Sequence, residues 1–155
     1  MRKIRAELPP PQDILTRALG VSVALCITVV LVAQLFSFEK VPMIFSEVIE
    51  VNMLVAGVIA SFIVVLELYS LPFLLGMALS KLMRVCSMVS GLAVLLFWLL
   101  VSIYTQLHST VPINIGFLGT IPITNGWWIV SSMTVLLTMF VWYTIRSRSI
   151  QSKRP

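Results

Sequence analysis

Four long hydrophobic runs dominate the chain, and short polar or proline-containing stretches separate them. They cover approximately residues 18–36, 51–75, 85–107 and 127–145. Each run approaches or exceeds the roughly 20 residues that an α-helix needs to cross a bilayer core. The runs stay apolar throughout, whereas the strands of a membrane barrel would alternate polar and apolar residues. The pattern therefore predicts an all-α integral membrane protein, folded as an up-down bundle of four helices.

The composition supports a membrane location. Of the 155 residues, 59% are hydrophobic and only 11% are charged, whereas a soluble domain carries about 25% charged residues. So few charges cannot cover a water-facing surface, and the lipid bilayer is the expected partner of the outer surface. We expect one membrane domain over residues 18–146, preceded by an N-terminal arm (residues 1–17) and followed by a basic tail (residues 147–155).

The basic residues predict the orientation. Ten of the eleven Lys and Arg residues lie before the first run, between the second and third runs, or after the fourth. The positive-inside rule places these segments, and hence both termini, in the cytoplasm, with the bundle in the bacterial inner membrane. The net charge of +5 follows from this bias and gives no indication of nucleic-acid binding. The ten residues are Arg2, Lys3, Arg5, Arg17, Lys81, Arg84, Arg146, Arg148, Lys153 and Arg154.

Two connections have a distinctive composition. Pro9, Pro10 and Pro11 predict an extended arm before a short helix that starts at Asp13, and no cleavage site follows the first run, which we therefore interpret as a retained anchor. The connection over residues 108–126 is apolar but rich in Gly and Pro, so we expect it to fold back on the outer mouth of the bundle. Trp127 and Trp128 then occupy the position of an interfacial aromatic belt.

Glu67 is the one charged residue inside the four runs. An ionisable group within a membrane helix is costly, which makes it a functional-site hypothesis by default. At ~1.5 Å per residue, the residues expected at its depth are Ser22 and Thr138, with Ser90 nearby, and no Lys, Arg or His. We therefore expect a protonated carboxyl that bonds to a neighbouring helix. Proton, quinone or partner chemistry at Glu67 is the alternative.

The remaining candidates are weaker. His108 is the only histidine and has no nearby Cys or carboxylate to complete a metal site, so we assign it to the interface. Cys26 and Cys86 differ in predicted depth by roughly 13 Å, too far for a disulfide, and are expected to be two buried small hydrophobic residues. Pro72 is expected to kink or end its helix near Ser70. The residues suggest no cofactor, no metal and no catalytic group.

Residues along about two thirds of the chain resemble the MauE/DoxX-like membrane proteins. Lys40 follows the first run where this family tends to place a lysine, and the segment from Asn114 through Gly119 resembles the loop that leads into the fourth helix of the MauE branch. Glu67 resembles the glutamate of the family's second helix, followed by its Leu-Leu-Gly end at Leu74, Leu75 and Gly76. The loop departs from the family's Cys-x-Cys-Phe-Gly pattern because it has no cysteine: Asn114, Ile115, Gly116 and Phe117 stand where the cysteine pair would lie.

The resemblance implies a non-catalytic accessory protein that assists the maturation or assembly of a membrane or periplasmic redox enzyme, in the manner of methylamine utilisation. Without the cysteine pair, thiol exchange by this chain alone is not expected. Two alternatives remain open. In the first, the chain is a structural subunit of a larger membrane complex. In the second, it is a small proton- or quinone-linked membrane protein that uses Glu67.

Overall fold

The computed structural model describes residues 13–108, 114–121 and 126–152, and for residues 148–152 only the backbone. Within these ranges the chain forms five helices, and four of them are long and apolar enough to cross a membrane. The prediction of an all-α bundle with four membrane spans is confirmed. The helices are α1 (Ile14–Phe36), α2 (Val41–Ile49), α3 (Met53–Leu74), α4 (Lys81–His108) and α5 (Trp127–Ser152).

The outer boundaries differ from the predicted ones because both end helices are longer than their apolar runs. The carboxylate of Asp13 accepts a hydrogen bond from the backbone N–H of Ile14 and caps α1, which begins at Ile14, four residues before the predicted start of the membrane domain. The short helix predicted from Asp13 is thus the first turn of α1. At the other end, α5 continues to Ser152, so most of the predicted basic tail is helical. The rest of the predicted arm, residues 1–12, lies outside the described residues.

The short helix α2 is a feature that the hydrophobic runs did not predict. The hydrophobic pattern places its residues in a connection, because they lie between two long runs and are too few to cross a bilayer. The buried side chains of α2 are Val41, Phe45 and Val48, a spacing typical of one helical face. The left-handed backbone of Glu50 (φ 55°) ends α2, and the side chain of Asn52 caps α3 through the N–H of Val55.

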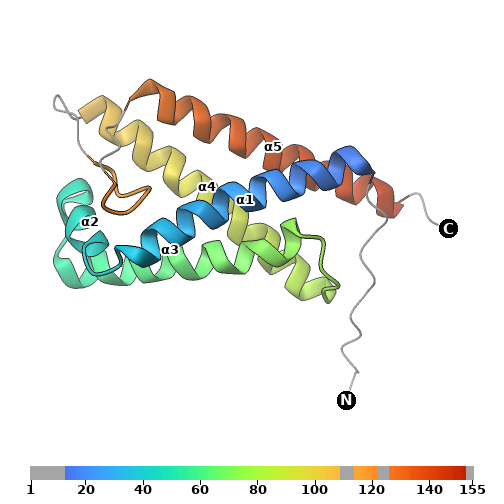
Figure 1. Cartoon of the computed structure of the whole chain (residues 1–155), viewed down its shortest axis with the longest axis horizontal. Coiled ribbons are helices and arrows are strands. Elements are labelled where there is room, and N and C mark those ends of the chain that lie inside the picture. Colours follow the sequence, from blue (N-terminus) through green and yellow to red (C-terminus); the bar gives the residue numbers. More distant parts are fainter. Residues whose placement is uncertain (1–12, 109–113, 122–125, 153–155) are drawn as a thin grey trace, which may run out of the picture.

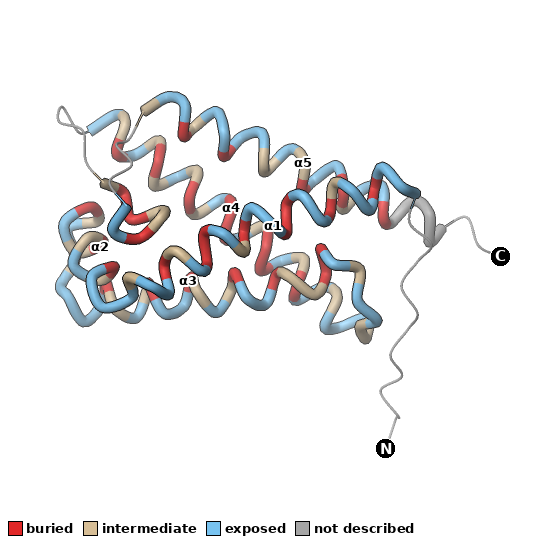
Figure 2. Tube along the Cα trace, viewed as in Figure 1, coloured by how far each residue is buried: buried red, intermediate tan, exposed pale blue. Residues whose placement is uncertain are grey.

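The long helices form a four-membered ring in which α1 packs on α3 and α5, and α4 packs on the same two helices. Figure 1 shows α1 running obliquely across the bundle, with α2 and residues 114–121 gathered at one end. We call this the loop end. The opposite end, where α1 begins, α3 turns into α4 and α5 finishes, is the terminal end. Buried residues line the inward sides of the helices, while their outer sides are exposed (Figure 2).

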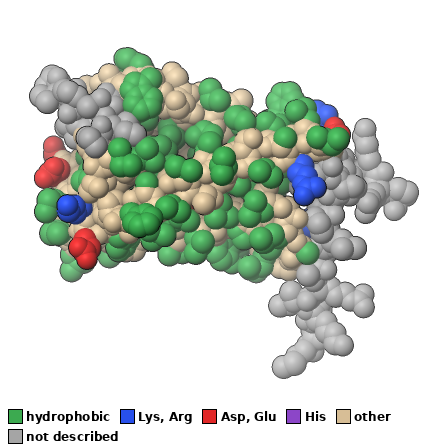
Figure 3. Space-filling model, viewed as in Figure 1, with side chains coloured by type: hydrophobic (Ala, Val, Ile, Leu, Met, Phe, Trp, Pro, Cys, Tyr) green, Lys and Arg blue, Asp and Glu red, His purple; other side chains and the backbone are tan. Residues whose placement is uncertain are grey.

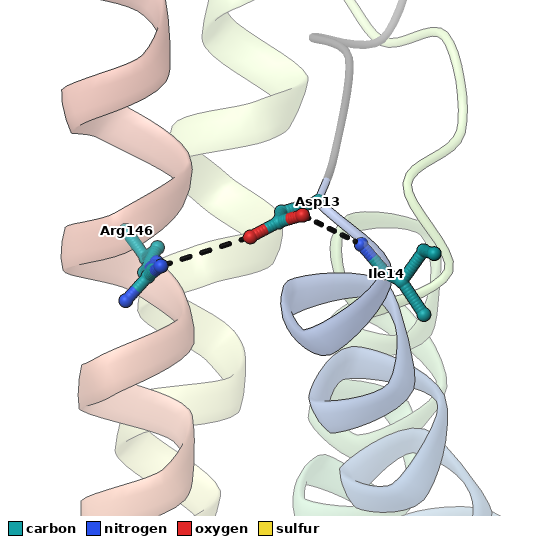
Figure 4. A network of polar contacts seen from close by, with 3 residues as sticks. All are labelled: Asp13, Ile14 and Arg146. Carbon is teal, nitrogen blue, oxygen red and sulfur yellow. Dashed lines mark hydrogen bonds and ion pairs between the residues drawn. The ribbon is translucent and has the colours of Figure 1, made fainter.

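Charged side chains on the face drawn in Figure 3 lie at the two ends of the bundle, as a membrane protein requires. The start of α1 and the end of α5 meet at the terminal end, where Arg146 lies 3.7 Å from the carboxylate of Asp13 (Figure 4). Both side chains are largely exposed, so the ion pair contributes little stability. The contact does place the beginning and the end of the bundle on the same side.

Two glycines allow the helices to approach closely. A Cβ atom on Gly20 would lie 2.7 Å from the carbonyl oxygen of Leu74 and 2.7 Å from the ring of Tyr143. A Cβ atom on Gly91 would lie 2.7 Å from the ring of Phe140. Small residues at such crossings are the usual means of packing membrane helices.

The sequence predicts that Pro72 kinks or ends the helix near Ser70. Helix α3 passes through Pro72 and ends at Leu74, so it does not end near Ser70. A proline removes one backbone hydrogen bond and crowds the preceding turn. Here a side chain from α4 forms hydrogen bonds with the backbone of this turn. The Oγ atom of Ser87 accepts from the N–H of Phe73 at 3.1 Å and donates to the carbonyl of Ser70 at 3.3 Å. A hydroxyl from a neighbouring helix is a recognised way to keep a proline inside a membrane helix.

Candidate functional site

Glu67 lies on the inner side of α3 and is fully buried. Its Oε1 atom accepts two hydrogen bonds, one from the side-chain amide of Gln34 at 3.2 Å and one from the indole N–H of Trp98 at 3.0 Å. These two residues come from α1 and α4, so the carboxyl joins three helices. The other oxygen, Oε2, is also buried and has no hydrogen-bond partner among the residues that the structure describes.

The predicted partners of Glu67 are wrong. Ser22 and Thr138 are on the exposed side of their helices, and the hydroxyl of Thr138 donates to the carbonyl of Thr134 in its own helix. Ser90 is buried, but its hydroxyl donates to the carbonyl of Cys86. The prediction assumed parallel helices that could be compared at equal depth. Because α1 crosses the bundle obliquely (Figure 1), a residue near its far end reaches Glu67 instead.

Gln34 was the residue that sequence reasoning missed. An amide is uncharged, so Gln34 does not stand out from the first run as Glu67 does from the second. The available signal was an amide within an otherwise apolar span, where a side-chain hydrogen bond to another helix is expected. Gln34 is 1% exposed, so its donors must find partners inside the protein.

The side-chain amide of Gln34 also joins the Glu67 site to the segment that precedes α5. Its Nε2 atom lies 3.3 Å from the backbone carbonyl oxygen of Phe117, which accepts a second hydrogen bond from it. The rings of Phe117 and Trp98 meet edge to face with centroids 5.1 Å apart. Phe45 of α2 contacts Trp98 in a similar geometry, with centroids 5.8 Å apart. The two donors to Glu67 are thus covered at the loop end by α2 and by the segment that contains Phe117.

The prediction that this connection folds back on the bundle is confirmed for its described part, residues 114–121. Ile115 is fully buried, and the N–H of Thr120 donates to the hydroxyl of Ser37 at the end of α1. Gly119 has a positive φ of 61°, and a Cβ atom there would clash with the hydroxyl of Ser37. Only glycine fits that combination of backbone conformation and close approach.

Lys40 and His108, the other candidates, lie apart from Glu67. Lys40 is exposed at the start of α2. His108 is exposed at the end of α4, where its ring stacks on Tyr104 with centroids 4.5 Å apart and its Nδ1 atom lies 3.0 Å from the Tyr104 carbonyl. The three candidates therefore do not form one site.

The two cysteines lie on the outer surface, so the expectation that they are buried is wrong. The expectation came from soluble proteins, where water drives small apolar residues inward. Lipid accommodates the same side chains equally well, and their hydrophobicity therefore does not predict burial in a membrane bundle. Both thiols are free.

The chemistry of the Glu67 site follows from its closed geometry. An acceptor held between two N–H donors in a low-dielectric interior is suited to fixing helices relative to one another. The described residues contain no group of three or more His, Cys, Asp or Glu side chains that could hold a metal ion. Comparison with known proteins finds no matching family model, curated protein or solved structure.

Proposed function

We propose that this chain is a non-catalytic accessory protein of the bacterial inner membrane that assists the maturation or assembly of a membrane or periplasmic redox enzyme. The observation that carries the proposal is the closure of the Glu67 site. The one acidic side chain inside the spans is fully buried and bonded to α1 and α4. Such a carboxyl stabilises a scaffold, and the scaffold then acts through its surface. The resemblance to MauE/DoxX-like proteins suggests the kind of client.

The orientation in this proposal has both termini in the cytoplasm. The described basic residues of the terminal end are Arg17, Lys81, Arg84 and Arg146, while the loop end carries Glu39, Glu47 and Glu50 with one lysine. Lys and Arg near membrane helices favour the cytoplasmic side. The loop end, with α2 and residues 114–121, would then face the periplasm, where the client enzyme is matured.

Deletion of the chain, followed by measurement of the activity and disulfide state of the membrane and periplasmic oxidoreductases in the same cells, tests this proposal. We expect one enzyme to lose activity and to accumulate in an immature form, with its transcript unchanged. Complementation with the intact chain should restore it. If instead every oxidoreductase stays fully mature and the chain purifies in fixed stoichiometry with other membrane proteins, it is a structural subunit.

A second function, proton- or quinone-linked chemistry at Glu67, is favoured by one observation. The buried Oε2 atom has no hydrogen-bond partner among the described residues, and an unsatisfied buried acceptor calls for an explanation. The variant Glu67→Gln separates the two functions. It keeps an acceptor oxygen for the two donors, so client maturation persists if the residue is structural and stops if the carboxyl must exchange a proton.

A further inference from the structure

The segment over residues 114–121 is a compact unit with its own internal bonds. The side chain of Asn114 accepts from the N–H of Gly116 at 3.0 Å and donates to the carbonyl of Gly119 at 3.2 Å. A further bond joins the N–H of Gly119 to the carbonyl of Gly116 at 3.0 Å. Because these bonds lie within the segment, it can move as one body without breaking them.

Among the residues that the structure describes, two hydrogen bonds join this unit to the bundle. One runs from the side-chain amide of Gln34 to the carbonyl of Phe117, at 3.3 Å, and the other from the N–H of Thr120 to the hydroxyl of Ser37, at 3.2 Å. The apolar contacts include Phe117 on Trp98, Gly116 beside the ring of Phe45, and Ile115, which is fully buried in the core cluster that also contains Phe45 and Trp98. Gln34 differs from the other contacts because the same nitrogen also bonds to Glu67. A change at the buried carboxyl is therefore transmitted directly to the segment.

We propose that residues 114–121 form a lid over the Glu67 site, and that Gln34 is the latch that holds it closed. With the lid closed, the carboxyl is sealed from the loop end by Gln34, Phe117 and the ring of Trp98. With the lid open, Phe117 leaves Trp98, and water from the loop end reaches the carboxyl of Glu67. The lid is independent of the proposed function, because it operates whether or not the chain has a redox client.

The test measures how often the lid opens in purified protein in detergent micelles, so that membrane orientation plays no part. Ile115→Cys, introduced after Cys26→Ala and Cys86→Ala, places a reporter thiol at the fully buried lid position. The thiol reacts with a polar maleimide only when the lid is open, so the rate reports the open population. We expect slow labelling with the latch intact. We expect Gln34→Ala and Glu67→Leu each to accelerate labelling at least about threefold, the effect of losing one membrane hydrogen bond.

Matched controls separate lid opening from general loosening. Glu67→Gln retains the acceptor and should keep labelling slow. Glu67→Leu should accelerate labelling less in a chain that already carries Gln34→Ala than in the parent, because the bond from Gln34 is then already lost and the remaining effect is that of the bond to Trp98. Ser132→Ala should have no effect, because this exposed hydroxyl bonds to its own helix at Trp128. A second reporter, Val48→Cys, lies buried on α2 at the same end and should label at one rate in all variants.

Three results would overturn the proposal. The first is fast labelling at position 115 with Gln34 and Glu67 intact, together with rapid deuterium exchange of the Thr120 backbone N–H in the chain that keeps Ile115. Both results together mean that no closed lid exists. Equal rates in Gln34→Ala, Glu67→Leu and the parent mean that Gln34 is no latch. A parallel acceleration at position 48 means that the whole end has loosened rather than the lid.

Discussion

The indole N–H of Trp98 donates to the carboxyl of Glu67 across 3.0 Å, between residues 31 positions apart in the chain. Both side chains are buried, so water cannot take the place of either hydrogen-bond partner. An indole has one donor and no acceptor, which makes the carboxyl the partner on which the orientation of Trp98 depends. This bond, together with that from Gln34, predicts how substitutions at Glu67 behave.

Glu67→Leu should destabilise the bundle by about 1–2 kcal/mol, because two buried donors lose their acceptor. Glu67→Gln should cost less than half of that, since its amide oxygen can still accept from Trp98 and Gln34. Unfolding in mixed micelles monitored by circular dichroism measures both. The exposed Glu39→Leu serves as the control for removing a charge. Equal losses for Glu67→Gln and Glu67→Leu would show that the hydrogen bonds do not determine the stability.

Gly20→Ala should lower stability by roughly 1–3 kcal/mol, the usual cost of overpacking. The added methyl group would press on the backbone of Leu74, which cannot move aside without shifting α3. Gly57→Ala is the matched control, because the nearest atoms to a Cβ there are 4.0 Å away, on Pro42. That control should be neutral or slightly stabilising through helix propensity. The apparent melting temperatures of the two variants decide the comparison.

Ser87→Ala should cost about 1 kcal/mol in the parent and clearly less in a chain that also carries Pro72→Ala. The hydroxyl of Ser87 bonds to the backbone on both sides of Pro72, and an alanine at 72 lets α3 satisfy its own backbone there. A double-mutant cycle of unfolding free energies yields the coupling. Ser90→Ala, whose hydroxyl bonds within its own helix, should show no coupling to Pro72→Ala.

Replacing both cysteines, Cys26→Ala with Cys86→Ala, should leave stability and function unchanged, because both thiols are free and lie on the outer surface. The stability of the purified variant and its ability to complement a deletion strain measure this. A large functional loss in a variant that still inserts would assign the thiols a role that their positions do not suggest.

Green fluorescent protein fused after Pro155 should be fluorescent, and alkaline phosphatase fused at the same position should be inactive. The reason is that ten of the eleven basic residues precede the first hydrophobic run, separate the second from the third, or follow the fourth. Paired fusions of alkaline phosphatase and green fluorescent protein provide the measurement. Periplasmic phosphatase activity at this position would reverse the orientation and place the lid in the cytoplasm.

The hydrophobic runs predicted the four spans to within a few residues, since a bilayer leaves the backbone little choice but a continuous helix. The same reasoning identified Glu67 and the connection that folds back. It did not identify Gln34, because which residues meet depends on the crossing angle of α1, and no periodicity within one helix encodes that angle. It does not predict α2 because the apolar stretch that contains Val41, Phe45 and Val48 is too short to cross a bilayer.

The ring order of the helices has a consequence for synthesis at the ribosome. The packing of α1 on α5, seen at Gly20 and Tyr143, joins the first span to the last, so it can form only after the whole chain has emerged. The bonds of Glu67 involve α1, α3 and α4 alone, and all three precede α5. A nascent chain with three inserted spans therefore already contains Gln34, Glu67 and Trp98, whose hydrogen bonds join α1, α3 and α4. We expect α5 to dock against this preassembled surface.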